Sequence, residues 1–297
     1  MIRQRNDNLK LVKRTKIIRL LSKLSIYAVL VVFAIWILLP FTIIISTSIR
    51  TWQEANSLGF KFIPKKFSIE GYINALTFKS FASTLPLLLR GFINTFIFVV
   101  PTTILGLLFS SISGYAYAKI DFKGKKTLFT IMIITMLIPG TVMVAPSYVM
   151  YDTIRWTGTP LPIIVPGMFG AAAATFFMRQ YYTGIPTDLV DAAKLDGMNH
   201  IKIFFHIMVP LSKPALIAQG ILGFMGGYND YFAPYIYLQD PEQYTVQIAL
   251  RNFAGTYAAE INTLMAGSII VLLPALIIYI FAQRYFIEGI VTTGMKL

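Results

Sequence analysis

The stretch from residue 185 to residue 214 has the sequence IPTDLVDAAKLDGMNHIKIFFHIMVPLSKP and separates two long apolar segments. It combines acidic, basic and small residues, and its apolar residues recur at helical spacing. Because the flanking segments are apolar enough for lipid, this polar stretch is typical of a helical connection at the membrane surface. We therefore expect two short helices, separated at Gly197, that join two membrane spans.

Individual residues indicate where these two helices begin and end. Thr187 or Asp188 can cap the first helix, since short polar side chains accept hydrogen bonds from free backbone N–H groups. Gly197 follows a run of helix-forming residues and suits the left-handed conformation with which many helices end. Asn199 can cap the second helix, and Pro210, which lacks a backbone N–H, is expected to end it.

The composition indicates a membrane protein. Of the 297 residues, 56% are hydrophobic and 13% are charged, and the mean hydropathy is +0.66. A spanning helix needs roughly 20 mostly apolar residues, whereas an open sheet could not satisfy its backbone in lipid. We therefore predict an all-α integral membrane protein. Its six predicted transmembrane helices are 24–49, 87–117, 127–150, 161–180, 212–238 and 262–284.

The net charge is strongly positive, at +13 from 26 basic and 13 acidic residues. Nucleic-acid binding would be one explanation, but cytoplasmic loops of membrane proteins also carry an excess of Lys and Arg. With a cytoplasmic N-terminus, 18 of the 26 basic residues fall on the cytoplasmic side. We therefore expect a multi-pass protein with both termini and the 185–211 loop in the cytoplasm, and no nucleic-acid partner.

Motifs that would indicate chemistry are missing from the sequence. It has no cysteine, no glycine-rich phosphate-binding loop and no nucleophile elbow. His200 and His206 are six residues apart without further ligands nearby, which argues against a zinc site. We expect no catalytic residue, no metal site and no cofactor bound by this chain.

Residue patterns alone leave other classes of protein open, and the loop could be a plain helical surface loop. A self-contained secondary transporter would be expected to have charged groups in mid-membrane and repeated halves. An integral membrane enzyme would be expected to cluster His, Asp or Glu at one membrane face. The sequence shows neither pattern, so both classes are disfavoured.

The loop resembles the signature of ABC importer permeases. That signature is Glu-Ala-Ala, three residues, glycine, nine residues, isoleucine, one residue and Leu-Pro. With every spacing kept, the corresponding positions here hold Asp191-Ala192-Ala193, Gly197, Ile207 and Val209-Pro210. Asp stands for the first Glu and Val for the Leu.

The resemblance extends over roughly residues 90–297 and is strongest to the carbohydrate branch, in particular to the maltose-type second permease. The segments that carry it are Gly114–Lys119, Phe122–Lys125, Ile138–Gly140, Pro146–Tyr148, Phe177–Gln180, Tyr228–Pro234 and Gln283–Lys296. The runner-up interpretations are permeases of the same family for glycerol phosphate, peptides or amino acids.

This resemblance implies a type I ABC importer permease fold with a cytoplasmic coupling-helix loop. It implies a permease subunit of an ATP-driven sugar importer in the bacterial inner membrane. The implied partners are a second homologous permease, two ATP-binding subunits, an extracytoplasmic sugar-binding protein and the lipid bilayer. ATP and magnesium would be bound by the partner ATPase.

Two groups of site residues follow from the resemblance. The residues expected to couple the chain to the ATPase are Asp191, Ala192, Ala193, Gly197, Met198 and Pro210. The tail residues expected to contact the ATPase are Gly294, Met295 and Lys296.

A third group lies near the outer end of the fifth predicted span. The candidates for a substrate pathway are Tyr228, Asn229, Asp230 and Tyr231. Polar groups within a span are functional candidates, and sugars favour aromatic faces and carboxylate or amide partners. The alternative is that these residues only cap a helix end. Just before them lie four glycines, Gly220, Gly223, Gly226 and Gly227. These small residues predict close helix packing or, alternatively, a flexible gate.

The chain is expected to have four regions. They are a basic interfacial tail (1–23), the first transmembrane helix with an outer segment (24–86), the permease core (87–284) and a cytoplasmic C-terminal tail (285–297).

Overall fold

The computed structural model describes residues 2–57, 62–79 and 84–294, with side chains described only between residues 18 and 283 of that part. Within these residues the regular elements are all helical, and one antiparallel bridge joins Arg50 to Phe67. The predicted all-α fold is confirmed. The α-helices are α1 (Ile2–Ser48), α2 (Trp52–Ala55), α3 (Glu70–Thr77), α4 (Leu87–Lys119), α5 (Lys125–Leu137), α6 (Val144–Thr153), α7 (Leu161–Met168), α8 (Ala172–Thr183), α9 (Asp188–Leu195), α10 (His200–Ile203), α11 (Val209–Leu211), α12 (Lys213–Asn229), α13 (Phe232–Tyr237), α14 (Val246–Thr256) and α15 (Ile261–Gly294). Two 3-10 helices, η1 (Gly140–Met143) and η3 (Pro241–Gln243), and one π-helix, η2 (Phe204–Met208), complete the list.

Four continuous helical segments in the described residues are long and apolar enough to cross a membrane. They are Ile18–Ser48, Leu87–Lys119, Leu161–Thr183 and Ile261–Gln283. Two bent helix pairs raise the number of candidate spans to six. The six predicted spans are therefore present only when each bent pair is counted as one span.

The span predicted over 127–150 is not one continuous helix. Helix α5 ends at Leu137, and the chain turns by 90° into η1 and α6. Pro139 explains this break, because proline lacks a backbone N–H and pushes the preceding residue out of the helical region. Accordingly Ile138 has extended backbone, with ψ at 117°. Since α5 has only 13 residues, it is about 20 Å long and too short to cross a bilayer alone.

The predicted span 212–238 is interrupted as well. Helix α12 stops at Asn229, Asp230 has extended backbone, and the short helix α13 follows as a separate element. At its other end, α12 is bent by 83° from the preceding helix at Ser212. The fourth span is a pair of helices, α7 and α8, that meet at Gly170 with a positive φ of 86°.

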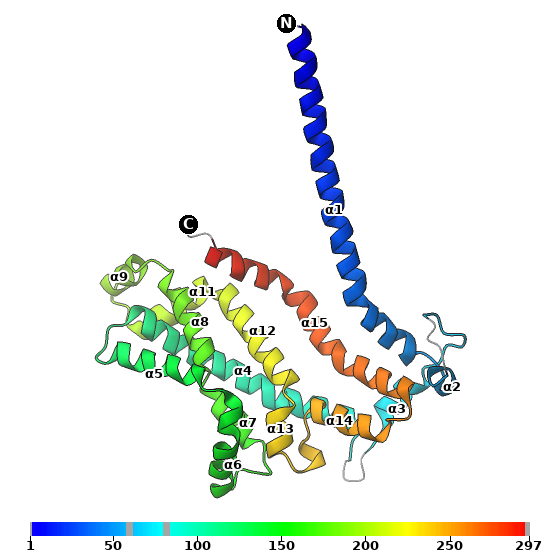
Figure 1. Cartoon of the computed structure of the whole chain (residues 1–297). Coiled ribbons are helices and arrows are strands. Elements are labelled where there is room, and N and C mark those ends of the chain that lie inside the picture. Colours follow the sequence, from blue (N-terminus) through cyan, green and yellow to red (C-terminus); the bar gives the residue numbers. More distant parts are fainter. Residues whose placement is uncertain (1, 58–61, 80–83, 295–297) are drawn as a thin grey trace.

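Helix α4 is the central element of the packed body. It contacts α7, α8, α12 and α14, and Figure 1 shows it running through the body beneath α12 and α8. Glycines allow these close contacts, because a Cβ at each would overlap a neighbouring helix. At Gly91 it would lie 2.9 Å from Val246 in α14, and at Gly114 2.8 Å from the backbone nitrogen of Arg179 in α8. At Gly106 it would lie 2.6 Å from the carbonyl oxygen of Gly167 in α7.

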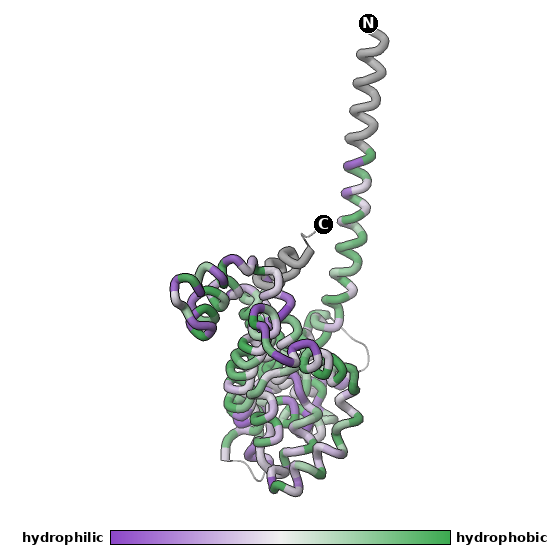
Figure 2. The backbone as a smooth tube through the Cα atoms, turned by 90° about the vertical axis from the view of Figure 1, so that its left-hand side faces the viewer, coloured by the Kyte–Doolittle hydropathy of each residue, from purple (hydrophilic) through white to green (hydrophobic). Residues whose placement is uncertain are grey.

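Helix α1 stands apart from this body (Figure 1). From Ile18 to Leu39 its side chains are exposed, and Figure 2 shows that this part is predominantly apolar. Its Ser48 end lies beside α15 (Figure 1), and Ser46, Thr47 and Ser48 are buried there. A long apolar helix without intramolecular cover suits contact with lipid or with another membrane chain.

Some of the α12 glycines lie in close helix contacts, as predicted, and others do not. A Cβ at Gly227 would lie 2.8 Å from Val99, and one at Gly220 would lie 3.3 Å from Leu107, so both positions face α4 closely. Gly223 is in ordinary contact distance, at 3.6 Å from Thr103. Gly226 has no atom within 4 Å of an added Cβ, so it does not serve close packing within this chain.

We predict that Gly114→Ala destabilises the protein by about 1–3 kcal/mol, because the new methyl group overlaps backbone atoms of α8 that cannot move away separately. Gly226→Ala is the matched control and should be neutral or slightly stabilising, since alanine favours a helix and the site is open. The measurement is the thermal melting temperature of each purified variant in detergent. Equal melting temperatures would show that α4 and α8 do not pack as described.

Candidate functional site: the loop of residues 185–211 and the end of α12

Helix α9 presents two different faces. Val190 and Ala193 are buried against the chain's own core, whereas Asp191 and Ala192 are exposed. At the end of the helix, Leu195 is 90% exposed. Of the two alanines predicted to couple to a partner, only Ala192 is therefore accessible, and Ala193 packs inwards.

The end of α9 matches the sequence-based expectation. Gly197 has a φ of +80°, in the left-handed region. The N–H of Met198 donates to the carbonyl of Ala193, and the N–H of Gly197 donates to the carbonyl of Lys194, both at 3.0 Å. This is the Schellman pattern of helix termination, in which Met198 also packs against the core near Ala193. The pattern turns the chain sharply and fixes the angle at which α9 leaves the body.

The start of α9 is held differently from the prediction. Thr187 occupies the cap position, but its side chain makes no capping hydrogen bond. Its hydroxyl instead accepts from Lys119 Nζ at 3.1 Å, and the same ammonium donates to the carbonyl of Ile185. The last residue of α4 therefore fixes the beginning of the loop.

The second half of the loop begins as expected and ends later than expected. Asn199 caps α10, and its Oδ1 accepts from the N–H of Lys202 at 2.9 Å. The prediction that Pro210 ends this helix is wrong, because helical backbone continues through η2 and α11 to Leu211. The five residues before Val209 are π-helical, and this wider turn accommodates the proline ring that would clash in a regular α-helix. Pro210 itself is exposed.

A hydrophobic cluster attaches the loop to two spans. Val190, Ile203 and Met208 from the loop pack with Tyr115 of α4 and Tyr182 of α8. All of these side chains are buried, at 3% exposure or less. Burial of large apolar side chains contributes roughly 1.5–3 kcal/mol each, so the loop is held as part of the folded body.

Hydrogen bonds inside this cluster connect four helices. The hydroxyl of Tyr182 lies 2.6 Å from Ser111 Oγ of α4 and 3.3 Å from Ser212 Oγ at the start of α12. Tyr115 in α4 bonds to Nδ1 of His200 in α10 at 3.0 Å. Because these groups are buried, a broken bond here leaves polar atoms without water or another partner. The network therefore ties α4, α8 and the start of α12 to the loop.

The four residues predicted at the outer end of α12 do not form one site. The hydroxyl of Tyr228 donates to the carbonyl of Val271 at 2.7 Å and is buried, which is a structural role. Asn229 donates to its own helix at Met225. Tyr231 stacks on Tyr235 with ring centroids 5.2 Å apart.

Asp230 differs from these neighbours. Its Oδ1 accepts from the N–H groups of Phe232 and Ala233 and so caps α13. The carboxylate also lines a hollow of about 150 Å³ between α4, α7 and α12, together with Thr102, Thr103 and Thr245. Asp230 therefore caps a helix and also lines a hollow, so the capping alternative does not exclude the pathway alternative. The three threonines were not among the predicted residues, although Thr102 and Thr103, as polar residues within an apolar span, gave a signal.

The predicted tail contacts lie at the edge of the described structure. Gly294 is the last residue of α15, while Met295 and Lys296 lie outside the described residues.

A known protein family covers most of the packed body and the loop. The family described as binding-protein-dependent transport system inner membrane component matches residues 106–291. The chain belongs to this family.

Individual relatives are sugar transport permeases by name. The arabinooligosaccharides transport system permease protein AraQ of Bacillus subtilis is 38% identical over 211 residues, 70% of this chain and 73% of that protein. The maltodextrin transport system permease protein MdxG of the same organism is 28% identical over 285 residues, 94% of this chain and 98% of that protein. The sequence-based assignment to the ABC permeases is confirmed.

A solved structure has the same fold. It is the crystal structure of a bacterial ABC transporter involved in the import of the acidic polysaccharide alginate, with a TM-score of 0.78 and 24% identity. The match covers 90% of this permease and 96% of that chain. The predicted permease fold is therefore confirmed.

We predict that Tyr182→Phe destabilises this permease by about 1–3 kcal/mol, since Ser111 and Ser212 then lose a buried hydrogen-bond partner. Tyr181→Phe is the neighbouring control. Its hydroxyl makes a single exposed bond to Leu211, so the change should cost about 0.5 kcal/mol or less. Thermal melting of the two purified variants compares them. If Tyr181→Phe melts at as low a temperature as Tyr182→Phe, the Tyr182 hydroxyl does not contribute more to stability than its exposed neighbour.

Proposed function

We propose that this chain is a membrane-spanning subunit of an ATP-driven, binding-protein-dependent importer of sugars, oligosaccharides in particular. The observation that carries the proposal is the loop unit, an exposed short helix fastened to three spans by buried contacts. The names of the relatives support a sugar as cargo. The chain itself has no phosphate-binding loop, so ATP and magnesium belong to partner subunits.

The exposed part of α9 is the proposed contact with an ATP-binding subunit. Asp191, Ala192 and Leu195 are open to solvent, and the small alanine lets a partner surface approach the helix backbone. Gly197, Met198 and Pro210 act in this proposal by setting the direction of the exposed surface. Ala193 contributes through packing beneath it.

Movement of the loop would then be transmitted to the membrane. When the ATP-binding subunits close, they displace α9, and the buried network carries α4, α8 and α12 with it. Such a device biases an equilibrium between inward- and outward-facing states, which responds to ligands that bind the two states differently. A shift from 1:99 to 99:1 requires about 5.5 kcal/mol, which binding and hydrolysis of ATP by the partners can supply.

The remaining partners and the orientation follow from the same proposal. A second homologous permease completes the translocation path, and an extracytoplasmic binding protein delivers the sugar. The distribution of Lys and Arg supports cytoplasmic termini and a cytoplasmic loop in the inner membrane of a bacterium. Gly294, Met295 and Lys296 are proposed to contact the ATP-binding subunits from the C-terminal tail.

We predict that Gly197→Ala uncouples the transporter. A non-glycine residue at φ +80° is strained, which costs about 1–2 kcal/mol and tilts the end of α9. Gly124→Ala is the matched control, since Gly124 has a φ of +82° and equally open surroundings but precedes α5. Sugar-stimulated ATP hydrolysis by the reconstituted complex should fall severalfold in the first variant only. Equal rates of ATP hydrolysis in the two variants would show that α9 is not part of the coupling surface.

The proposed function is tested by isolating the complex. The tagged chain is purified from its native membrane in mild detergent, and its partners are identified by mass spectrometry. After reconstitution in liposomes, uptake of maltotriose, arabinotriose and lactose is measured with and without ATP. We expect a second permease, an ATP-binding subunit and ATP-dependent uptake of at least one of these sugars. A chain that is recovered alone and transports without ATP would refute the proposal and indicate a secondary transporter.

A further inference from the structure

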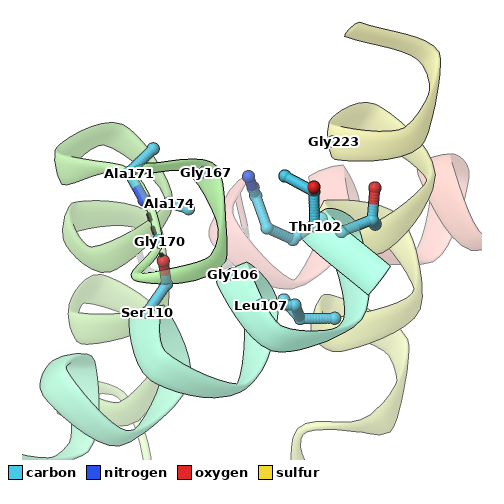
Figure 3. Close-up of a pocket in the computed structure, with 11 residues that line it drawn as sticks. Thr102, Gly106, Leu107, Ser110, Gly167, Gly170, Ala171, Ala174 and Gly223 are labelled. Atoms are coloured by element: carbon cyan, nitrogen blue, oxygen red, sulfur yellow. Dashed lines mark hydrogen bonds between the residues drawn. The ribbon is translucent and has the colours of Figure 1, made fainter. Parts of the chain in front are cut away.

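Two adjoining hollows lie along α4 within the membrane-spanning body. The outer hollow, of about 150 Å³, and the inner hollow, of about 180 Å³, share Thr102, Thr103 and Gly223 in their walls. Figure 3 shows the inner hollow, where Thr102 and Ser110 on α4 lie opposite Gly223 of α12 and the glycine-rich junction of α7 and α8. Because three residues line both, the two hollows are neighbours along α4.

The outer hollow contains a hydroxyl group that the fold does not use. Thr245 occupies the N-cap position of α14, where threonine normally accepts a hydrogen bond from its own helix. It makes no such bond here, and the N–H of Val246 donates instead to Thr95 Oγ1 at 2.8 Å. Thr245 is only 4% exposed, and its Oγ1 has no hydrogen-bond partner among the described residues. A buried hydroxyl without a partner costs stability, so its retention calls for a ligand.

Asp230 supplies a second group to the same hollow. Its Oδ1 is fixed by two backbone N–H groups of α13. Its Oδ2 makes no hydrogen bond or ion pair within the part of the chain that the structure describes. The carboxylate is thus held rigidly, with one oxygen available to accept a hydrogen bond.

The inner hollow also has a polar side chain in its wall. Gln219 lines it from α12 and lies on the same helix face as Gly223 and Gly227, four and eight residues further along. No hydrogen bond of the Gln219 amide occurs among the described residues, and the amide can both donate and accept. Gly223 leaves open the space between this amide and Thr103.

The charge of the residues that line the two hollows indicates which kind of cargo they suit. Among the described residues that line either hollow there is no Lys, Arg or His, and Asp230 is the one charged side chain. An anionic cargo such as a uronate or a sugar phosphate would need a cation here and would be repelled by the carboxylate. Hydroxyl groups suit the lining, since each can donate to Asp230 and can pair with Thr245 or Gln219.

We propose that this hollow binds the hydroxyl groups of a neutral saccharide during transport, with Thr245 and Asp230 as an outer subsite and Gln219 as an inner one. The proposal rests on the sugar-import function proposed above and narrows its substrate class. Under this proposal, the permease does not carry acidic sugars or glycerol phosphate. Thr245 keeps its hydroxyl unpaired in the empty protein because the passing sugar supplies the partner.

The first test removes only the hydroxyl. In the reconstituted complex, Thr245→Val should assemble and melt at the same or a higher temperature, since an unpaired polar group is replaced by an isosteric apolar one. Sugar imported per ATP hydrolysed should fall about three- to tenfold, the size of one lost hydrogen bond. Thr256→Val is the control on the same helix, because its exposed hydroxyl bonds to its own helix at Asn252, and both quantities should be unchanged. Unchanged import per ATP in Thr245→Val would overturn the proposal.

The second test does not depend on transport. The chain has no cysteine, so Thr245→Cys and Thr256→Cys each introduce its single thiol. The rate of modification by a small thiol reagent is measured on this subunit of the assembled complex, with maltotriose, arabinotriose, trigalacturonate or glycerol 3-phosphate present. We expect an imported neutral sugar to slow modification at position 245 at least threefold, with no effect at position 256. The two anionic compounds should not protect position 245.

The outcomes separate this proposal from the proposed function. If a neutral sugar is imported but position 245 is not protected, the hollow is not on its route and only the present proposal fails. If an anionic compound is imported and protects position 245, the assignment to neutral saccharides is overturned. If no sugar is imported with ATP and none protects, the sugar-import function fails as well.

Discussion

The close approach of α4 to its neighbours is the constraint on which the rest of the structure depends. Three glycines, Gly91, Gly106 and Gly114, bring α4 almost into backbone contact with α14, α7 and α8 in turn. In lipid, where burial of apolar surface drives helix association weakly, such tight packing is a main source of stability. One helix therefore fixes the two hollows along α4 and the loop of residues 185–211 relative to one another.

The proposed coupling role of the loop requires that it be attached to the spans and exposed at once. Its inner face belongs to a buried cluster with Tyr115 and Tyr182, while Ala192 and Leu195 face solvent. A loop held by surface contacts would bend when a partner pulled on it. Here the hydrogen bonds of the Tyr182 hydroxyl lie in a medium of low polarity, where breaking them is costly, so displacement passes to the spans.

Several structural features could be predicted from the sequence because they depend on local chemistry. The left-handed conformation of Gly197 and the cap at Asn199 follow from the residues themselves, and the spans follow from their length and hydropathy. The break at Pro139 was also readable from proline chemistry, but the apolar run around it concealed the bend. The end of the second loop helix was placed too early, since the π-helical turn that accommodates Pro210 depends on packing around Phe204 and Met208.

The sequence by itself determined that this protein is helical, crosses a membrane and carries the coupling loop of its family, because composition, spacing and turn chemistry are local properties. Only the tertiary structure decided which faces of those helices are buried against the rest of the chain and which are exposed. It turned Ala193 inwards and Leu195 outwards, gave Tyr228 a structural bond, and placed Thr245 and Asp230 in the wall of the same hollow. These residues are separated in the chain, so only the packing of helices against α4 could bring them together or keep them apart.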